Sequence, residues 1–99
     1  MSGHPRLRLN PHFTNPIRLA LMAALASVDE IDFQTLRDSL ALSDSTLSKH
    51  ASAMENEGYV HVRKGYVGKR PRTWLSCTAA GRKAFREHSA ALRELTEAP

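Results

Sequence analysis

The chain has 99 residues, of which 41% are hydrophobic and 24% are charged. These proportions are typical of one globular domain and exclude a wholly disordered chain. The longest apolar run, LALMAALASV, is too short to span a bilayer, so we expect a cytoplasmic protein without a membrane partner. The single cysteine, Cys77, excludes an internal disulfide and any metal site built from cysteines alone.

The formal net charge of +4 conceals a marked asymmetry along the chain. Residues 29–57 contain seven carboxylates and only two basic side chains. Residues 58–86 contain eight basic side chains and no carboxylate. The second block is therefore where a polyanion is expected to bind.

The first helix is predicted to begin after residues 1–9, which are expected to be flexible. Asn15 is a good capping residue, and Pro16 at the first helical position needs no hydrogen-bond partner for its nitrogen. Apolar residues then recur at helical spacing and predict a core-facing side. Leu19 and Met22 widen the apolar surface beyond that side, which suggests a contact across a subunit boundary.

Two further helices follow a stretch long enough for one short strand. Asp32 is predicted to cap the first of them and Ser43 the second, which ends at Gly58. The second helix, about residues 43–57, has one apolar side and one side with short polar side chains. Two helices joined by a short turn, the second with a polar outer face, are typical of a helix-turn-helix.

A β-hairpin is predicted over about residues 60–77. The segments YVHV and TWLSC alternate between apolar and polar residues and are separated by turn-forming glycine and proline. A register that pairs Val60 with Cys77 and Val62 with Leu75 places these four residues on one face, against the helices. The other face is basic, with Arg63 over the ring of Trp74. The tip is expected to project because it has no apolar anchor.

The last helix, residues 79–98, is predicted to be capped by Thr78 and carries an apolar stripe. Such a stripe folds back on its own core or pairs with another subunit. Because the domain is small, we expect a homodimer. The predicted interface residues are Leu19, Met22, Phe85, His88, Leu92 and Leu95. The predicted fold class is mainly α with a small β-hairpin (α+β), in one domain over residues 1–99.

The order helix, short strand, helix, helix, hairpin, helix is that of a winged helix-turn-helix. Over about residues 10–95 the chain resembles small winged-helix transcriptional regulators of the MarR and ArsR groups. The resemblance is carried by LSDSTLSKHASAMENEGYV, by the basic wing, and by LSCTAAG, which is similar to the L-T-x-x-G that opens the last helix in that family. It implies a homodimeric repressor or activator that binds specific sequences of double-stranded DNA. The sequence does not indicate whether a small-molecule effector exists.

The residues expected to contact DNA lie on two elements. The polar face of the helix at 43–57 suits the major groove, and the basic wing suits the backbone or the minor groove. Asp44, in the first turn of this helix, is expected to repel DNA, so affinity should depend mainly on the wing. The candidate contacts are Ser45, Thr46, Ser48, Lys49 and Ser52 on the helix and Arg63, Lys64, Lys69, Arg70 and Arg72 on the wing.

Other classes of function fit the residues less well. Ser45 and Lys49 lie one helical turn apart, but no third group orients the lysine and no oxyanion donor is evident, so no enzyme is predicted. No two histidines have ligand spacing on one helix, so no metal or other cofactor is expected. A winged helix that binds another protein in a larger assembly stays open as an alternative, because a fold alone does not define function.

Overall fold

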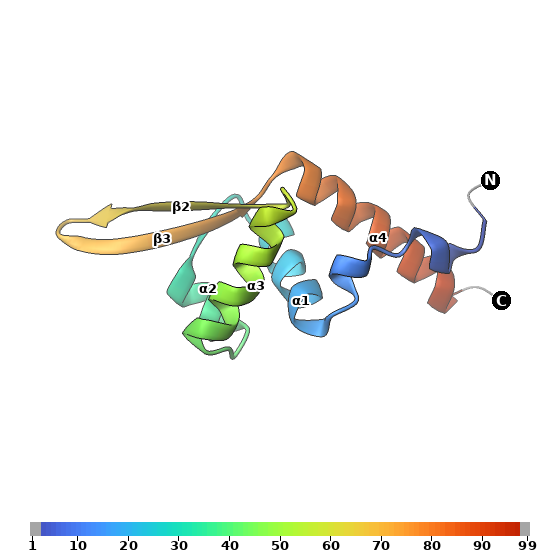
Figure 1. The fold of residues 1–99 in the computed structure, drawn as a ribbon, viewed down its shortest axis with the longest axis horizontal. Helices are drawn as coiled ribbons and strands as arrows, with labels where there is room; N and C mark the ends of the chain where they lie inside the picture. Colours follow the sequence, from blue (N-terminus) through green and yellow to red (C-terminus); the bar gives the residue numbers. More distant parts are fainter. Residues whose placement is uncertain (1–2, 98–99) are drawn as a thin grey trace.

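The computed structural model describes residues 3–97. The elements follow the predicted order, preceded by two short 3₁₀ turns (Figure 1). In chain order they are η1 (Pro5–Arg8), η2 (Pro11–Phe13), α1 (Pro16–Ala26), β1 (Ile31–Asp32), α2 (Phe33–Ser39), α3 (Asp44–Asn56), β2 (Val60–Val67), β3 (Arg70–Cys77) and α4 (Ala79–Glu97). The predicted winged helix-turn-helix with a long final helix is confirmed.

The sheet has three antiparallel strands in the order β1-β3-β2. Val60 pairs with Cys77 and Val62 with Leu75, which confirms the predicted register. Beyond these pairs β2 and β3 extend far past the helices as the wing (Figure 1). Gly68 (φ 63°) begins the two-residue turn at the tip, where only a residue tolerant of positive φ fits.

Each predicted helix cap is present. The Asn15 side chain accepts hydrogen bonds from the backbone of Ile17 and Arg18, and Asp32 and Ser43 cap α2 and α3 in the same way. These bonds satisfy backbone donors that a helix start leaves unpaired. The caps therefore help to define where α2 and α3 begin.

The core lies where α1, α2 and α3 meet the base of the sheet. Its fully buried side chains include Phe13, Leu21, Met22, Leu25, Leu36, Leu47, Met54 and Leu75. Met22, which was expected at a subunit interface, is 0% exposed and packs inside its own chain. Leu19 is half-buried and packs against the same core. The broad apolar surface of α1 therefore reflects its central position among the other elements.

The N-terminal segment covers part of the apolar stripe of α4. η1, inside the segment expected to be flexible, packs along α4 (Figure 1). The backbone N–H of Asn10 donates to Nδ1 of His88 at 2.9 Å, and the ring of Phe13 packs against those of Phe85 and His88. His88, which was predicted at a subunit interface, is only 2% exposed and is buried within its own chain.

The start of α4 lies unusually close to the backbone of Tyr59. Thr78 caps the helix by accepting a hydrogen bond from the N–H of Gly81 at 2.9 Å, and its own N–H donates to the carbonyl oxygen of Tyr59. A Cβ at Gly81 would lie 2.1 Å from that oxygen. Only glycine fits there, which explains the glycine in LSCTAAG.

We therefore expect Gly81→Ala to destabilise the protein by about 3 kcal/mol or more, because backbone atoms on both sides must separate. Urea unfolding followed by circular dichroism measures this change. Lys83→Ala, at an exposed position of the same helix, is the control and should change stability by less than about 0.5 kcal/mol. Equal stability of the two variants would contradict the close packing at Gly81.

Candidate nucleic-acid interface

Helix α3 presents a polar face to solvent because its apolar residues recur on the opposite side. Leu47, Ala51 and Met54 are buried in the core. Of the five helix residues predicted to contact DNA, four are exposed: Ser45, Ser48, Lys49 and Ser52. The serine hydroxyls can donate and accept hydrogen bonds and the lysine can donate them, although the Ser45 hydroxyl lies 3.3 Å from that of Ser43.

The fifth candidate on the helix, Thr46, belongs to the cap of α3. It is half-buried, and its backbone N–H donates to Oγ of Ser43 at 3.2 Å. The Ser43 hydroxyl in turn donates to Oγ1 of Thr46 at 2.9 Å. The Thr46 hydroxyl is therefore partly engaged within the protein.

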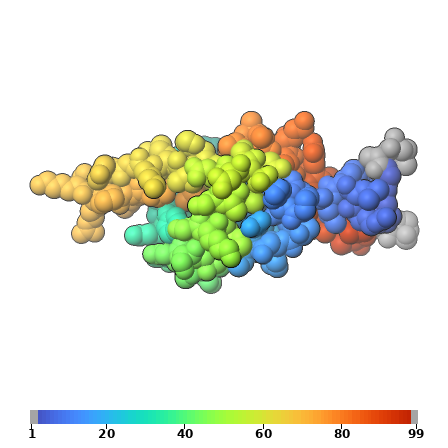
Figure 2. Space-filling model, in the orientation of Figure 1, coloured from blue at the N-terminus to red at the C-terminus, as the bar shows by residue number. Residues whose placement is uncertain are grey.

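The wing carries most of its positive charge without compensation. Lys64, Lys69, Arg70 and Arg72 are exposed, and none forms an ion pair with a described residue. The wing is a narrow projection at one end of a molecule that measures 55 × 25 × 20 Å (Figure 2). The charge at the tip of the wing therefore projects into solvent, whereas Lys64 lines the same groove as Asp44 and Glu55 of α3.

Arg63 differs from the other wing cations. Its guanidinium lies 4.0 Å from the centre of the Trp74 ring, as predicted, but it also donates two hydrogen bonds to Glu30, at 2.7 and 3.0 Å. These hydrogen bonds are the main reason that the pKa of Glu30 is lowered. Arg63 therefore fixes the base of the wing to the segment before β1, and its charge is compensated.

Asp44, which was expected to repel DNA, shares one arginine with Asp38. Arg37 at the end of α2 donates to Asp44 at 2.7 Å and to Asp38 at 2.9 Å. Hydrogen bonds from Arg37 to these two carboxylates raise the pKa of the arginine. The tight turn between α2 and α3, with Ala41 at a φ of 55°, brings Arg37 to the start of α3. No periodic pattern in the sequence predicts the contact between Arg37 and Asp44.

His50 lies on the buried side of α3, only 7% exposed. Its Nδ1 accepts a hydrogen bond from Nε of Arg18 at 3.1 Å. Burial, followed by the charges of Arg18 and Lys49, lowers the pKa of His50. The imidazole therefore links α1 to α3 in its neutral form.

Residues 3–97 contain no group of three or more His, Cys, Asp or Glu side chains that could hold a metal ion. Cys77 is half-buried, and burial raises the pKa of its thiol. Within residues 3–97 no helix combines the length and hydropathy needed to cross a membrane.

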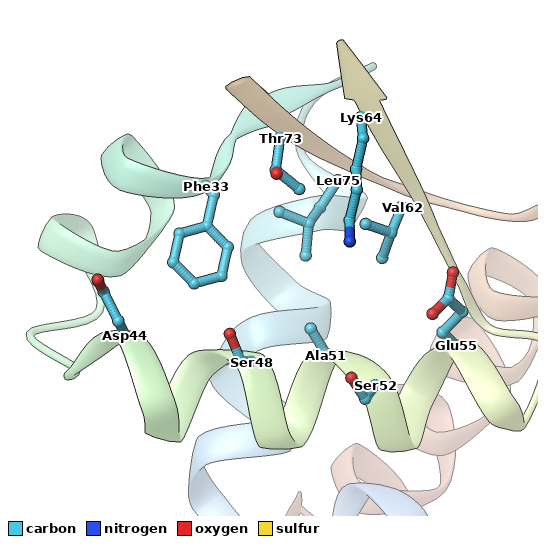
Figure 3. Close-up of a pocket in the computed structure, with 10 residues that line it drawn as sticks. All are labelled: Phe33, Asp44, Ser48, Ala51, Ser52, Glu55, Val62, Lys64, Thr73 and Leu75. Carbon is cyan, nitrogen blue, oxygen red and sulfur yellow. The ribbon is translucent and has the colours of Figure 1, made fainter. Parts of the chain in front are cut away.

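A groove separates α3 from the wing (Figure 3). It has a volume of about 360 Å³ and an apolar floor that includes Phe33, Val62 and Leu75. Ser48 and Ser52 line it from α3, and Lys64 lines it from β2. The helix hydroxyls and a wing cation thus face one continuous surface.

A helix-turn-helix followed by a basic hairpin defines a winged helix-turn-helix protein. The chain belongs to the winged helix DNA-binding domain family, which matches residues 17–96. This match confirms the predicted resemblance to small winged-helix transcriptional regulators. The family is described as a DNA-binding domain, and a solved relative is described as a transcriptional regulator homologue.

Individual relatives support the same assignment. An uncharacterized protein from Methanocaldococcus jannaschii is 27% identical over 85 residues, which cover 86% of this chain and 92% of that protein. The solved structure of a transcriptional regulator homologue from Pyrococcus horikoshii OT3 is 26% identical, with a TM-score of 0.81, covering 87% of this chain and 85% of that one. NadR in complex with 4-hydroxyphenylacetate is 26% identical, with a TM-score of 0.74, covering 95% of this chain and 66% of that one.

The buried histidine of α3 generates a pH prediction. Because the pKa of His50 is lowered in the folded state, the unfolded chain binds a proton there more readily. Neutral His50 therefore contributes to the free energy of unfolding at neutral pH, and this contribution is lost as the pH falls below the ordinary histidine pKa of about 6.5.

We expect the free energy of unfolding to fall between about pH 7.5 and pH 5.5, and to fall less steeply in His50→Asn, whose side-chain oxygen still accepts from Arg18. Urea titrations at several pH values measure the slope. His61→Asn, on the exposed face of the wing, is the control and should keep the wild-type slope. A His50→Asn slope equal to the wild-type slope would contradict this role of burial.

Proposed function

We propose that the protein is a sequence-specific transcriptional regulator that binds double-stranded DNA as a homodimer, with α3 in the major groove and the wing on the backbone or in the minor groove. The observation that carries this proposal is the position of α3 beside the wing. The hydroxyls of Ser48 and Ser52 share a groove with Lys64, so one duplex would meet both elements at once.

The exposed face of α3 has the chemistry needed to read base edges. Serine hydroxyls both donate and accept hydrogen bonds, and the lysine ammonium pairs with guanine acceptors or with phosphate. An α-helix fits the major groove, which is about 12 Å wide. The pairing of Arg37 with Asp44 removes much of the repulsion at the start of the helix, where the helix dipole favours a phosphate.

The wing supplies the electrostatic part of the affinity. Lys64, Lys69, Arg70 and Arg72 have no compensating carboxylate among the described residues. Each contact between such a cation and a phosphate releases a counterion, so binding should weaken strongly with salt. A wing with this uncompensated charge suits nucleic acid better than a neutral protein surface.

The proposed dimer interface lies at the end of the molecule opposite the wing tip. Leu7 of η1 is 66% exposed and Leu95 of α4 is 39% exposed, with Leu92 half-buried. Phe85, nearer the start of α4, is half-buried against the core and contributes less surface. A two-fold dimer would present two copies of α3 to half-sites about 10 base pairs apart.

The direct test is a gel shift with the DNA upstream of the protein's own operon. Excess nonspecific DNA is included as competitor. The proposal expects a shifted band that the competitor does not remove. Complete removal by competitor would contradict sequence-specific binding. The lack of any complex with DNA at low salt would instead favour the protein-binding alternative.

Replacing one wing cation should weaken binding to all sequences alike. We expect Arg70→Gln to weaken DNA binding and to lower the salt slope by about one unit, because one phosphate contact is lost. Fluorescence anisotropy over a range of salt concentrations measures both quantities. Arg63→Gln is the matched control, with a smaller loss, because Arg63 is already engaged by Glu30 and Trp74. Equal losses in the two variants would contradict this assignment.

Placing a charge on the proposed dimer interface should separate the subunits. We expect Leu95→Glu to convert a dimer into a monomer, because a buried, unpaired carboxylate opposes association. Analytical ultracentrifugation measures the mass, and circular dichroism checks the fold. Lys83→Glu, on an exposed part of α4, is the control and should form an assembly of the same mass as the wild type. A wild-type protein that is monomeric at all concentrations would contradict the homodimer.

A further inference from the structure

The groove between α3 and the wing contains a carboxylate that has no structural partner. Glu55, near the end of α3, is exposed, and its carboxylate forms no hydrogen bond or ion pair with any residue in 3–97. Figure 3 shows its side chain directed from α3 toward the sheet, beside Val62. Lys64 reaches from β2 toward α3 along the same groove. Two opposite charges thus line one concave surface.

The geometry of B-DNA determines what would occupy this groove. The major groove and the adjacent minor groove are separated by one sugar-phosphate strand. If α3 enters the major groove and the wing reaches the next minor groove, that strand must cross the space between α3 and β2. This step rests on the proposed function.

The groove has donors that suit a phosphodiester. The Ser48 and Ser52 hydroxyls line it from α3 and the Thr73 hydroxyl from β3, and Lys64 provides one positive charge. Hydroxyls and a lysine are common donors to phosphate oxygens. A single strand of backbone is therefore the occupant that the chemistry of the groove favours.

We propose that the groove between α3 and the wing seats the DNA strand that separates the two grooves, and that Lys64 and Glu55 oppose each other in setting the affinity. Lys64 attracts the phosphates, and Glu55 repels them. The repulsion from Asp44, the other carboxylate along the groove, is reduced by Arg37, which Asp44 shares with Asp38. Glu55 is consequently a residue that limits affinity.

Nothing in the local structure requires a carboxylate at position 55. The residue caps no helix, because Glu57 occupies the C-cap of α3, and a negative charge near the carboxyl end of a helix is unfavourable. The neighbouring Glu57 differs, because it pairs with Nε2 of His12 at 3.1 Å. Replacement of Glu55 by glutamine should therefore leave the fold intact.

The experiment compares the DNA affinity of the wild type with those of Glu55→Gln, Lys64→Gln and the double variant. The DNA is a fluorescent duplex that the wild type binds, or a random duplex at low salt. We expect Glu55→Gln to bind roughly threefold more tightly at low salt, since a charge about 6 Å from phosphate contributes on this scale in water. We expect Lys64→Gln to bind more weakly by a similar factor. The gain from Glu55→Gln should shrink as salt rises.

Two controls distinguish a direct effect of Glu55 on the DNA strand from an effect of net charge and from an effect through Lys64. Glu87→Gln removes the same charge from an exposed position on α4 and should leave affinity unchanged, since the effect depends on proximity to the strand. Glu55→Gln should also tighten binding in the Lys64→Gln background. Loss of the gain in that background would mean that Glu55 acts only by restraining Lys64, and would overturn the proposal.

The measured affinities distinguish failure of this inference from failure of the proposed function. If the wild type binds DNA but Glu55→Gln and Lys64→Gln match it, the strand does not cross the groove, and the proposed function stands without this inference. An equal gain in Glu55→Gln and Glu87→Gln would also overturn the inference, because net charge alone would explain it. If no variant binds any duplex, the proposed function itself fails.

Discussion

The pairing of Val60 with Cys77 and of Val62 with Leu75 is the constraint on which the site depends. Val60 and Leu75 are buried against the helices, so the register cannot shift by one residue without exposing them. This register places Lys64 on the side of the groove and Arg63 on the opposite side, over Trp74. Past the buried pairs no core remains to hold the strands, and the wing projects into solvent with its charge exposed.

The function depends on which charges the fold leaves uncompensated. Two ion pairs, between Arg63 and Glu30 and between Arg37 and Asp44, join neighbouring elements and remove charges from the surface offered to DNA. On the surface proposed to meet DNA, the cations without an ion pair to a described residue are Lys64, Lys69, Arg70 and Arg72 on the wing and Lys49 on α3, and exposed cations without such a pair also lie on α4. The two pairs join α2 to α3 and the base of the wing to the segment before β1.

Local patterns in the sequence predicted much of this structure. Asn15, Ser43 and Thr78 cap helices because the bonds involved span only two or three residues, and the hairpin register follows from alternation. The sequence did not predict contacts between distant residues. Asn10 binds His88, which is 78 positions away, and this contact covers a stripe that had been interpreted as a subunit interface. The pairing of Glu30 with Arg63 and the groove beside Glu55 were missed for the same reason, since neither leaves a periodic pattern.

The central claim, that α3 and the wing meet DNA together on one side of the molecule, is tested most directly by NMR. A ¹⁵N-labelled sample is titrated with a duplex, and the shifts of the backbone amides and of the Trp74 indole N–H are followed. The account predicts that the largest changes fall on residues 43–56 and 63–73, with small changes along α1. Changes confined to α1 and α4, with the wing amides unmoved, would contradict it.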